Sequence, residues 1–397
     1  MTEKADTISG MKEDEYAAVY VHWPFCISKC PYCAFASVRR NDQSLYDEFG
    51  DLLLLDLRKS VAEVGLKGVK SVFFGGGTPS LASPRAIEKI LNFLFKNYPA
   101  ENGVEITLEA NPATFDESKI KSFKNAGINR LSLGVQSFFD KNLRFLGRIY
   151  DGKQAIEAAE IVSRNFENFS FDFMCGYETQ TAEDLESDLV QAADFGCKHI
   201  SCYQLTFEEG TPFYRKAQTG EIKKINENKE AKLFDLVENV LRDRDIFRYE
   251  VSNYSKRGFE SRHNLAYWKY DDYLGIGPSA CSRISLDGKK REMEKTRDPF
   301  LWKAALERGE TTFFRDDALT EEEKLTEAIA MGLRLTSGIT TEDLYNKVSR
   351  KVVDRIVSEE KLKFLREKKL VDDDLSKIRL TKTGFKKIDA VAGFLLE

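Results

Sequence analysis

The sequence predicts an α/β protein in which a partial (β/α)6 barrel precedes a small, mainly helical C-terminal domain resembling a winged helix. Short apolar strands alternate with helical segments, which is typical of a parallel sheet with helices outside it. Six such units are too few to close an eight-stranded barrel, so we expect an open sheet. Polar motifs directly follow several strands, at the edge where parallel sheets bind ligands. The alternation stops near Asp287.

The barrel is predicted over residues 17–286, together with an extension, and residues 1–16 are predicted to be a disordered polar tail. The six strands are expected at Ala17–Trp23, Ser71–Phe74, Val104–Leu108, Arg130–Val135, Phe169–Met174 and His199–Leu205. The helices between them are expected at Gln43–Val64, Pro84–Phe95, Glu117–Ala126, Lys153–Ser163 and Ala182–Phe195.

The C-terminal domain is predicted over residues 287–397. Helical spacing occurs at Glu321–Leu335, Thr341–Val348 and Ser358–Lys368, followed by a ribbon over Leu370–Leu380 and a last helix over Thr383–Leu396. This pattern resembles a winged helix, for which DNA binding is the obvious alternative function. From Leu319 onward, however, 16 Lys and Arg residues face 15 Asp and Glu residues, without the basic stripe that nucleic acid requires. We therefore expect a lid or docking domain over the barrel mouth.

Composition excludes several classes of protein. The 397 residues are 42% apolar and 31% charged, with a net charge of −5, which discourages non-specific phosphate binding. The polar first sixteen residues do not form a signal peptide, and the apolar run Leu52–Leu55 is far too short to cross a bilayer. Seven cysteines, three of them clustered, indicate a reducing compartment. We expect a cytoplasmic protein with at most peripheral membrane contact.

Three cysteines with CxxxCxxC spacing, Cys26, Cys30 and Cys33, follow the first strand. Thiolates are soft ligands that suit Zn²⁺ or iron–sulfur clusters. A structural zinc site usually takes four ligands, whereas only three cysteines cluster here and the chain has no second CxxC pair. The pattern therefore favours a four-iron cluster with one iron left open for a substrate or co-substrate. Zinc and free structural thiols remain weaker alternatives.

A glycine-rich loop, Gly75–Ser80, follows the second strand. It has neither the Lys-Ser/Thr of a P-loop nor the GxGxxG spacing of a dinucleotide site. Glycines allow the backbone to approach a ligand closely, although a simple tight turn explains such a loop almost as well. Its place beside the cysteine loop, at the same edge of the sheet, favours a ligand-binding role.

These motifs together resemble a known family. The chain is similar to the branch of the radical S-adenosylmethionine (SAM) superfamily that holds oxygen-independent, HemN-like coproporphyrinogen III oxidase and the HemW haem chaperones. The resemblance runs from about residue 18 to the C-terminus. Besides the cysteine loop, it rests on Tyr20–Cys26, Gly75–Ser80, Gly134–Phe138, Tyr203–Thr206, Tyr249–Tyr254, His263–Trp268 and Gly275–Pro278.

The resemblance implies roles for matching residues. Cys26, Cys30 and Cys33 would bind a [4Fe–4S] cluster whose open iron chelates the amino and carboxylate groups of SAM. The methionyl end of SAM would lie against Gly76, Gly77 and Thr78. Six further residues match positions that line the SAM pocket of the oxidase, namely Tyr20, Tyr32, Glu109, Gln136, Arg148 and Asp172. The alternative for Glu109 and Asp172 is a strand-end charge that faces solvent.

One position separates the two branches. The oxidase has a fourth cysteine closely after the three, and Phe35 stands at that position here. The resemblance therefore favours the HemW branch, which implies haem binding, delivery of haem to an acceptor such as a respiratory protein, and a homodimer. The alternative is a radical-SAM oxidase acting on coproporphyrinogen III or a related substrate. We expect no coproporphyrinogen oxidase activity, and leave open whether the protein is an enzyme of another kind.

Haem requires an axial ligand, usually His, Cys, Met or Tyr. Of the three histidines, His263 is the candidate, because Arg262, Tyr267 and Trp268 offer a cation and aromatic surface beside it. The sequence departs from the family at three places, which concern the substrate pocket rather than the cluster. Tyr150 and Cys281 stand where relatives often have histidine, and Met174–Thr179 replaces a Leu-Pro-Gly-like loop. Cys281 and Met293 are weaker candidates for the ligand.

Overall fold

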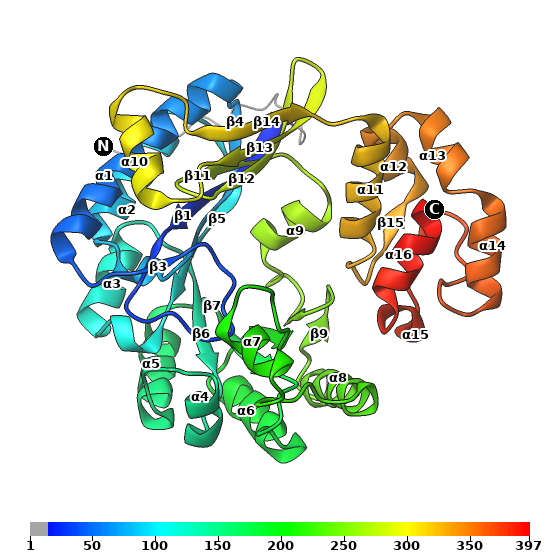
Figure 1. Cartoon of the computed structure of the whole chain (residues 1–397), viewed down its shortest axis with the longest axis horizontal. Helices are drawn as coiled ribbons and strands as arrows, with labels where there is room; N and C mark the ends of the chain where they lie inside the picture. The colour runs from blue at the N-terminus through cyan, green and yellow to red at the C-terminus, as the bar shows by residue number, and fades with distance from the viewer. Residues whose placement is uncertain (1–14) are drawn as a thin grey trace.

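The structure, a computed structural model, describes residues 15–397 and contains a 12-stranded open sheet (Figure 1). Six neighbouring strands of this sheet run parallel, and the first and last of them are not paired with each other, which confirms the partial barrel. These strands are β1 (Tyr16–Trp23), β4 (Gly68–Gly76), β5 (Ala100–Ala110), β6 (Arg130–Gln136), β7 (Asn168–Cys175) and β8 (His199–Gln204). The predicted tail lies outside the described residues up to residue 14, and Tyr16 already belongs to β1.

The helices of the barrel begin where the sequence supplies side chains that cap a helix. Asp42, Asp116 and Asp151 accept hydrogen bonds from the first backbone N–H groups of their helices, and Asp151 also forms a capping box with Gln154. The predicted helices are α1 (Gln43–Val64), α2 (Pro84–Asn97), α3 (Glu117–Asn125), α5 (Gly152–Asn165) and α6 (Ala182–Asp194). Their apolar faces and the outer face of the sheet form one continuous core.

Several elements were not predicted, both within the barrel and between it and the C-terminal domain. The helices are α4 (Asp140–Phe145), α7 (Pro212–Gln218), α8 (Glu227–Arg242) and α9 (Arg262–Trp268). Strands β9 (Phe247–Arg248) and β10 (Asn253–Ser255) extend the sheet beyond β8 in antiparallel order. A two-residue parallel pair, β2 (Phe25–Cys26) with β3 (Val38–Arg39), closes the base of the cysteine loop.

The other edge of the sheet continues past the boundary expected at residue 287. Strand β11 (Tyr273–Ile276) runs parallel to β1, and β12 (Cys281–Leu286), β13 (Lys289–Lys295) and β14 (Phe313–Ala318) follow in antiparallel order. Helix α10 (Pro299–Glu307) lies between β13 and β14. The main sheet therefore ends at Ala318. The sequence did not indicate this because β13 and β14 are mostly charged and carry little apolar alternation.

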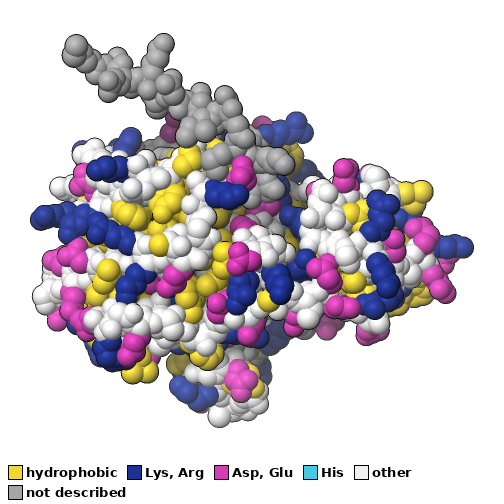
Figure 2. Space-filling model, turned by 90° about the horizontal axis from the view of Figure 1, so that it is seen from above, with side chains coloured by type: hydrophobic (Ala, Val, Ile, Leu, Met, Phe, Trp, Pro, Cys, Tyr) yellow, Lys and Arg dark blue, Asp and Glu magenta, His cyan; other side chains and the backbone are white. Residues whose placement is uncertain are grey.

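The C-terminal domain has its own apolar core. Its elements are α11 (Glu321–Gly332), β15 (Ile339–Thr340), α12 (Thr341–Lys347), α13 (Arg350–Ile356), α14 (Glu359–Glu367), β16 (Lys377–Ile378), α15 (Lys382–Phe385) and α16 (Ile388–Leu396). Helix α13 was not predicted, and the expected last helix is two helices. On the face that Figure 2 shows, positive and negative side chains are interspersed over this domain. No helix among residues 15–397 is long and apolar enough to span a membrane.

The C-terminal domain is docked beside the barrel (Figure 1). The Thr336 N–H donates to the Tyr249 carbonyl at 3.0 Å, and Arg283 of β12 forms an ion pair with Glu327 of α11 at 2.8 Å. Lys386 pairs with Asp235 of α8 at 2.9 Å. These contacts support the docking interpretation. The lid interpretation is not supported, because residues 319–397 contribute nothing to the lining of the barrel cavity described below.

A buried ion pair ties the extension to the first helix. The Lys295 Nζ of β13 donates to Asp56 Oδ1 of α1 at 2.8 Å, and both side chains are 1% exposed. The same ammonium donates to Ser60 and Thr312, each at 2.8 Å. Asp56 also accepts from the Gly277 N–H. A buried charge is tolerated when it is paired and fully hydrogen bonded in this way.

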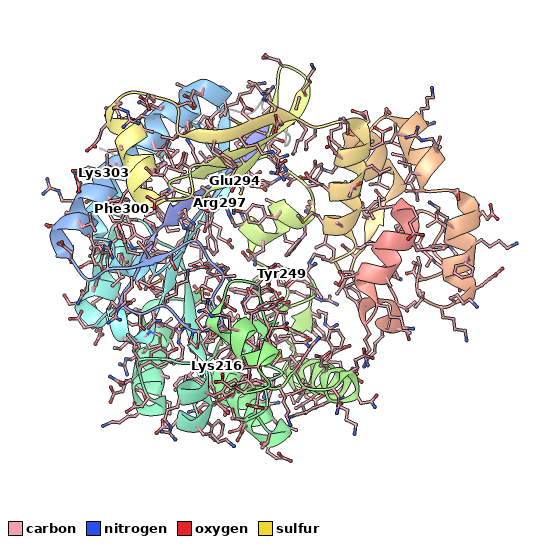
Figure 3. The ribbon with its side chains drawn as sticks, viewed as in Figure 1. Lys216, Tyr249, Glu294, Arg297, Phe300 and Lys303 are labelled. Carbon is pink, nitrogen blue, oxygen red and sulfur yellow. The ribbon has the colours of Figure 1, made fainter. Side chains whose placement is uncertain are left out.

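We expect Asp56→Ala to destabilise the protein by about 3–5 kcal/mol, because the Lys295 ammonium would lose its counter-charge in the core. Chemical denaturation measures this free energy. The matched control is Lys303→Ala on α10 (Figure 3), which breaks partly exposed pairs with Glu48 and Glu307 and should cost about 0–1 kcal/mol. Equal losses in the two variants would contradict a special role for the buried pair.

Candidate functional site

One cavity of about 700 Å³ occupies the interior of the barrel and opens at the carboxyl ends of its strands. All of the predicted cluster and SAM residues, and the haem candidate His263, contribute to its lining. They are Tyr20, Cys26, Cys30, Tyr32, Cys33, Gly76, Gly77, Thr78, Glu109, Gln136, Arg148, Asp172 and His263. The fold therefore gathers residues from β1 to α9 around a single space, as topology and the polar strand ends indicated.

The cysteine loop is held by contacts from its own ends. The His22 Nε2–H donates to the Ala36 carbonyl at 2.8 Å, and the Tyr20 hydroxyl donates to His22 Nδ1 at 3.1 Å. Burial lowers the pKa of His22, so the ring is neutral and keeps this tautomer. The Lys29 ammonium donates to the carbonyls of Phe35 and Ser37. The loop is thus shaped without using its thiols.

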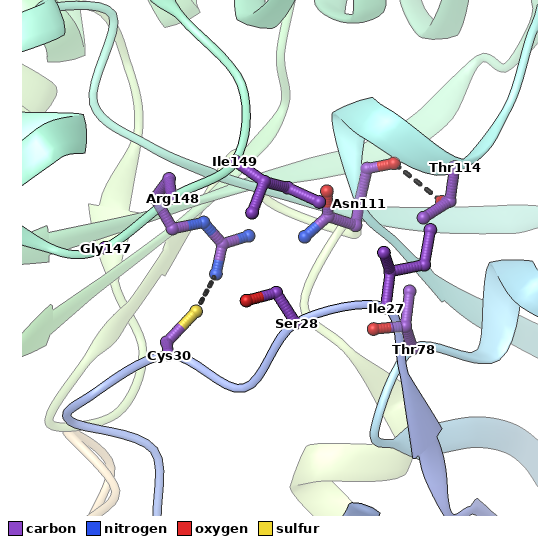
Figure 4. A pocket seen from close by; sticks show the side chains of 9 residues that line it. All are labelled: Ile27, Ser28, Cys30, Thr78, Asn111, Thr114, Gly147, Arg148 and Ile149. Atoms are coloured by element: carbon purple, nitrogen blue, oxygen red, sulfur yellow. Dashed lines mark hydrogen bonds between the residues drawn. The ribbon is translucent and has the colours of Figure 1, made fainter. Parts of the chain in front are cut away.

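All three thiols of the loop are free and line the cavity. Arg148 Nη1 donates to Cys30 Sγ at 3.0 Å (Figure 4). Burial raises the pKa of Cys33. In residues 15–397 no three His, Cys, Asp or Glu side chains form a group that could hold one metal ion. A cluster takes one thiolate on each of several irons, so it needs thiols around it rather than thiols meeting at one point.

Arg148 is anchored by Tyr150. Its Nε donates to the Tyr150 hydroxyl at 2.9 Å, and that hydroxyl in turn donates to the Gly134 carbonyl at 2.7 Å. Arg148 Nη1 also donates to the Tyr32 hydroxyl at 3.3 Å. Tyr150 therefore positions a cation next to the cysteine loop. A buried cation at this point stabilises thiolates and the negative charge of a cluster.

The glycine loop packs directly against the chain that enters the cysteine loop. The Gly77 N–H donates to the Trp23 carbonyl at 2.6 Å, and the Thr78 N–H donates to the Phe25 carbonyl at 2.8 Å. A Cβ on Gly77 would lie 2.5 Å from the Phe25 oxygen, and one on Gly76, whose φ is 108°, would lie 2.6 Å from the His22 ring. These glycines are therefore required by the contact between the two loops. Their backbone also lines the cavity, as a ligand-binding loop requires.

Two buried carboxyl groups, those of Glu109 on β5 and Asp172 on β7, line the cavity. Glu109 accepts from the Gly76 N–H at 3.2 Å, and burial, with a smaller contribution from the Asp172 charge, raises its pKa to about 8. Burial also raises the pKa of Asp172. Asp172 Oδ2 accepts from Ser132 at 2.8 Å, whereas its Oδ1 is buried without a partner among the described residues. Neither group is a strand-end charge facing solvent.

Gln136 ends β6 with a φ of 66°, in the left-handed region that a non-glycine residue enters at a cost of about 1–3 kcal/mol. The strand register to β7 is irregular at the same point. Such strain is typical of functional sites. Here it brings the carboxamide into the cavity lining.

His263 lies in the cavity wall with both ring nitrogens engaged. Its Nδ1 is 2.9 Å from the Ser71 hydroxyl and its Nε2 is 2.9 Å from the Tyr267 hydroxyl. The side chain is 1% exposed, and burial lowers its pKa to about 3. Neither nitrogen is free for iron in this arrangement, so coordination by His263 requires the Tyr267 bond to break. As a haem ligand His263 stays a prediction.

The residues expected to surround a haem at His263 do not share one space. Arg262 donates to the carbonyls of Asn102 and Gly103, away from the cavity lining. Trp268 lines a separate cleft of about 1150 Å³ between α9 and the C-terminal domain. Of the weaker ligand candidates, Met293 is buried in the core and Cys281 is exposed at the start of β12. Phe35 is 62% exposed and lies at the cavity opening.

Several lining residues were missed by sequence reasoning, although the strands carry a signal for them. Along β6, Leu131, Leu133 and Val135 pack into the outer core, and the residues that alternate with them, Arg130, Ser132, Gly134 and Gln136, line the cavity. The missed residues include Asn111, Arg130, Ser132, Met174, His199, Ser201 and Tyr203. Barrel interiors are usually filled by branched apolar side chains, so this polar inner face itself indicates a binding cavity.

The residues present fit a cluster and SAM. Free thiols beside a buried arginine suit an anionic iron–sulfur cluster, and the unpartnered Asp172 oxygen suits a hydroxyl or ammonium donor from a ligand. Buried carboxyl groups beside the glycine loop suit the cationic sulfonium and amine of SAM.

We expect the stability of the apoprotein to fall as pH rises from about 5 to 8, relative to a Glu109→Gln variant. Folded Glu109 keeps its proton up to about pH 8, whereas the unfolded chain loses it near its ordinary pKa. The folded state therefore binds more protons in this window, and each pH unit removes at most about 1.4 kcal/mol. Denaturant titrations at several pH values measure the difference. Parallel curves for the two proteins would contradict the raised pKa.

Comparison with known proteins agrees with this geometry. The profile of the radical SAM superfamily matches residues 20–192, and that of the HemN C-terminal domain matches residues 319–385. Among solved structures, coproporphyrinogen III oxidase (HemN) from Escherichia coli superimposes with a TM-score of 0.80 over 96% of this chain and 90% of that one. The two sequences are 20% identical, so this likeness concerns the fold.

Relatives with assigned names are closer in sequence. The heme chaperone HemW of Buchnera aphidicola (subsp. Schizaphis graminum) is 38% identical over 68% of this chain and 70% of its own length. HemW of Bacillus subtilis is 33% identical over 92% of this chain and 96% of its own length. The mitochondrial radical S-adenosyl methionine domain-containing protein 1 of Bos taurus is 36% identical over 82% of this chain and 74% of its own length. The chain therefore belongs to the HemW family of radical SAM proteins.

Proposed function

We propose that this protein is a haem chaperone of the HemW type, which binds haem and delivers it to an acceptor protein. The observation that carries the proposal is the cavity lining, which combines a three-cysteine loop with Phe35 in place of a fourth cysteine. The names of the HemW relatives, which cover most of the chain, support the same function.

A [4Fe–4S] cluster is proposed at Cys26, Cys30 and Cys33, with Arg148 as the neighbouring cation. A cluster of this kind, when bound with SAM, supplies radical chemistry. SAM is proposed to bind with its methionyl end at Gly76, Gly77 and Thr78. Tyr20, Tyr32, Glu109, Gln136 and Asp172 are proposed to complete its pocket, because they line the same cavity.

Delivery of haem requires a partner, and we propose that the acceptor is a haem-accepting protein of the same compartment, respiratory proteins included. The cytoplasm is proposed as that compartment, since all seven cysteines are free thiols. A homodimer is proposed as a further assembly. The docked C-terminal domain presents a mixed-charge surface, which supports protein contacts rather than nucleic-acid binding.

The proposal is tested by titrating the purified chain with haem, following the Soret band, and then adding an apo-haemoprotein. We expect a stoichiometric complex and transfer of haem to the acceptor. Failure to bind haem, or retention of haem against excess acceptor, would contradict chaperone function.

The reconstituted protein should not convert coproporphyrinogen III to protoporphyrinogen IX, because Phe35 stands where the oxidase has its fourth cysteine. Product analysis under anaerobic conditions, with SAM and a low-potential reductant, measures this. Coproporphyrinogen III oxidase assayed in parallel is the positive control. Robust product from this chain would restore the oxidase alternative.

Cys33→Ser should abolish the cluster, since two remaining thiolates of the loop cannot hold a four-iron unit. Iron and sulfide content should fall together, with loss of the broad visible absorption. Cys281→Ser, at the exposed start of β12, is the matched control and should keep both. A Cys33→Ser protein that kept its iron but lost zinc would show that the cluster assignment is wrong.

A further inference from the structure

The floor of the cavity carries a buried cation that the cluster and SAM assignments leave unused. Arg130 begins β6, lines the cavity and is 2% exposed. Its Nε has no hydrogen-bond partner among the described residues and lies 3.9 Å from Glu105 Oε2, with which it forms a loose ion pair. Buried guanidinium groups are normally hydrogen bonded, so Arg130 keeps a donor that the described chain does not use.

Glu105 does not satisfy this arginine because other donors use its oxygens. Glu105 Oε1 accepts from the Ser261 hydroxyl and the His263 N–H, and Oε2 accepts from the Arg262 N–H, at 3.2–3.3 Å. The carboxylate is therefore committed to the start of α9. It balances the charge of Arg130 without meeting its hydrogen-bonding geometry.

His199 supplies a second unused donor at the same floor. The Ser261 N–H donates to the Tyr249 oxygen at 3.4 Å, and the Tyr249 hydroxyl, 2.8 Å from His199 Nε2, then donates to that nitrogen (Tyr249 is labelled in Figure 3). Burial lowers the pKa of His199, so the ring is neutral and its proton lies on Nδ1. Nδ1 is buried without a partner in the described chain, and the residue lines the cavity.

Three residues with aromatic rings, Tyr20, Phe73 and His263, lie beside this floor. The Phe73 ring lies 4.9 Å from the His263 ring and 6.2 Å from the Tyr20 ring, with an interplanar angle of 24° in both cases. All three residues line the cavity. Phe73 is thus stacked on His263, and with Tyr20 the two rings form an aromatic wall against which a flat ring system can lie.

The floor is remote from the loops assigned to SAM. Arg130 lies six residues before Gln136 on the same strand, which corresponds to roughly 20 Å along β6. The glycine loop, where the methionyl carboxylate is proposed, follows the far ends of the strands. A carboxylate at Arg130 therefore belongs to a different ligand.

We propose that Arg130 and His199 form a subsite for a carboxylate arm of a tetrapyrrole, whose ring system lies against Phe73 and His263, with Tyr20 at the border between this site and the SAM pocket. A guanidinium and a neutral imidazole N–H are suitable donors for a carboxylate. The inference rests on the haem binding proposed above, and it places the propionate side of haem inside the barrel.

The experiment compares haem with haem dimethyl ester, whose propionates carry no charge, on the full-length wild-type chain and on Arg130→Gln. Wild type should bind haem at least about tenfold more tightly than the ester, as expected for loss of a charged hydrogen bond. Arg130→Gln should lose about the same factor for haem and little for the ester, because the variant and the ester remove the same interaction.

Two control variants test whether the loss of affinity is specific to this subsite. Arg248→Gln removes another buried arginine, outside this cavity, and Lys347→Gln removes a cation of the cleft beside the C-terminal domain; both should keep wild-type haem affinity. Equal binding of haem and ester by wild type, or a loss in Lys347→Gln alone, overturns the subsite while leaving the chaperone function intact. Absence of any haem binding overturns both. If Arg130→Gln does not fold, Arg130→Lys and the wild-type comparison decide the matter.

Discussion

The site depends on the contact between two loops that leave room for no side chain between them. The amides of Gly77 and Thr78 donate to the carbonyls that lead into Cys26, so the glycine loop and the cysteine loop form one unit. The distances that a Cβ would meet at Gly76 and Gly77 explain these two glycines without a ligand. A ligand can still use their backbone, because the contact has already fixed its position before binding. Ligand binding and loop packing therefore both require glycine at these two positions.

The polar interior of the barrel is the second feature of general interest. Unpartnered atoms of Arg130, Asp172 and His199 weaken the folded state, since each buried polar group without a partner costs about 1–3 kcal/mol. The apolar outer faces of the same strands offset this cost by packing against helices. Sheets with one apolar and one polar face can bind ligands inside without losing their core. Such an interior lowers the stability of the folded state but provides a ligand-binding site, as is common in binding proteins.

Sequence reasoning succeeded where the signal was local. The six parallel strands, their helices and the cysteine and glycine loops followed from alternation and motifs within a few residues of one another, and the SAM-pocket residues followed from the family resemblance. It failed where contacts join distant segments: the bond of His263 to Ser71, the direction of Arg262 and the place of Trp268 depend on how α9 meets β4, β5 and the C-terminal domain. Strands β13 and β14 were missed because their charged residues have no apolar period. The role of Tyr150 could not be predicted from the sequence, because it depends on where Arg148 lies in space.

The ion pair between Asp56 and Lys295 has a consequence for folding during synthesis on the ribosome. The two residues are separated by 239 positions, which at about 5–20 residues per second corresponds to roughly 12–48 s of synthesis. During that interval the emerging first helix carries a carboxylate destined for the core without its cation. Until β11 has been synthesised, one edge of strand β1 has no pairing partner and is open to incorrect pairing. Until β11 and β13 have been synthesised, the nascent barrel therefore has both an unpaired carboxylate and an unpaired strand edge.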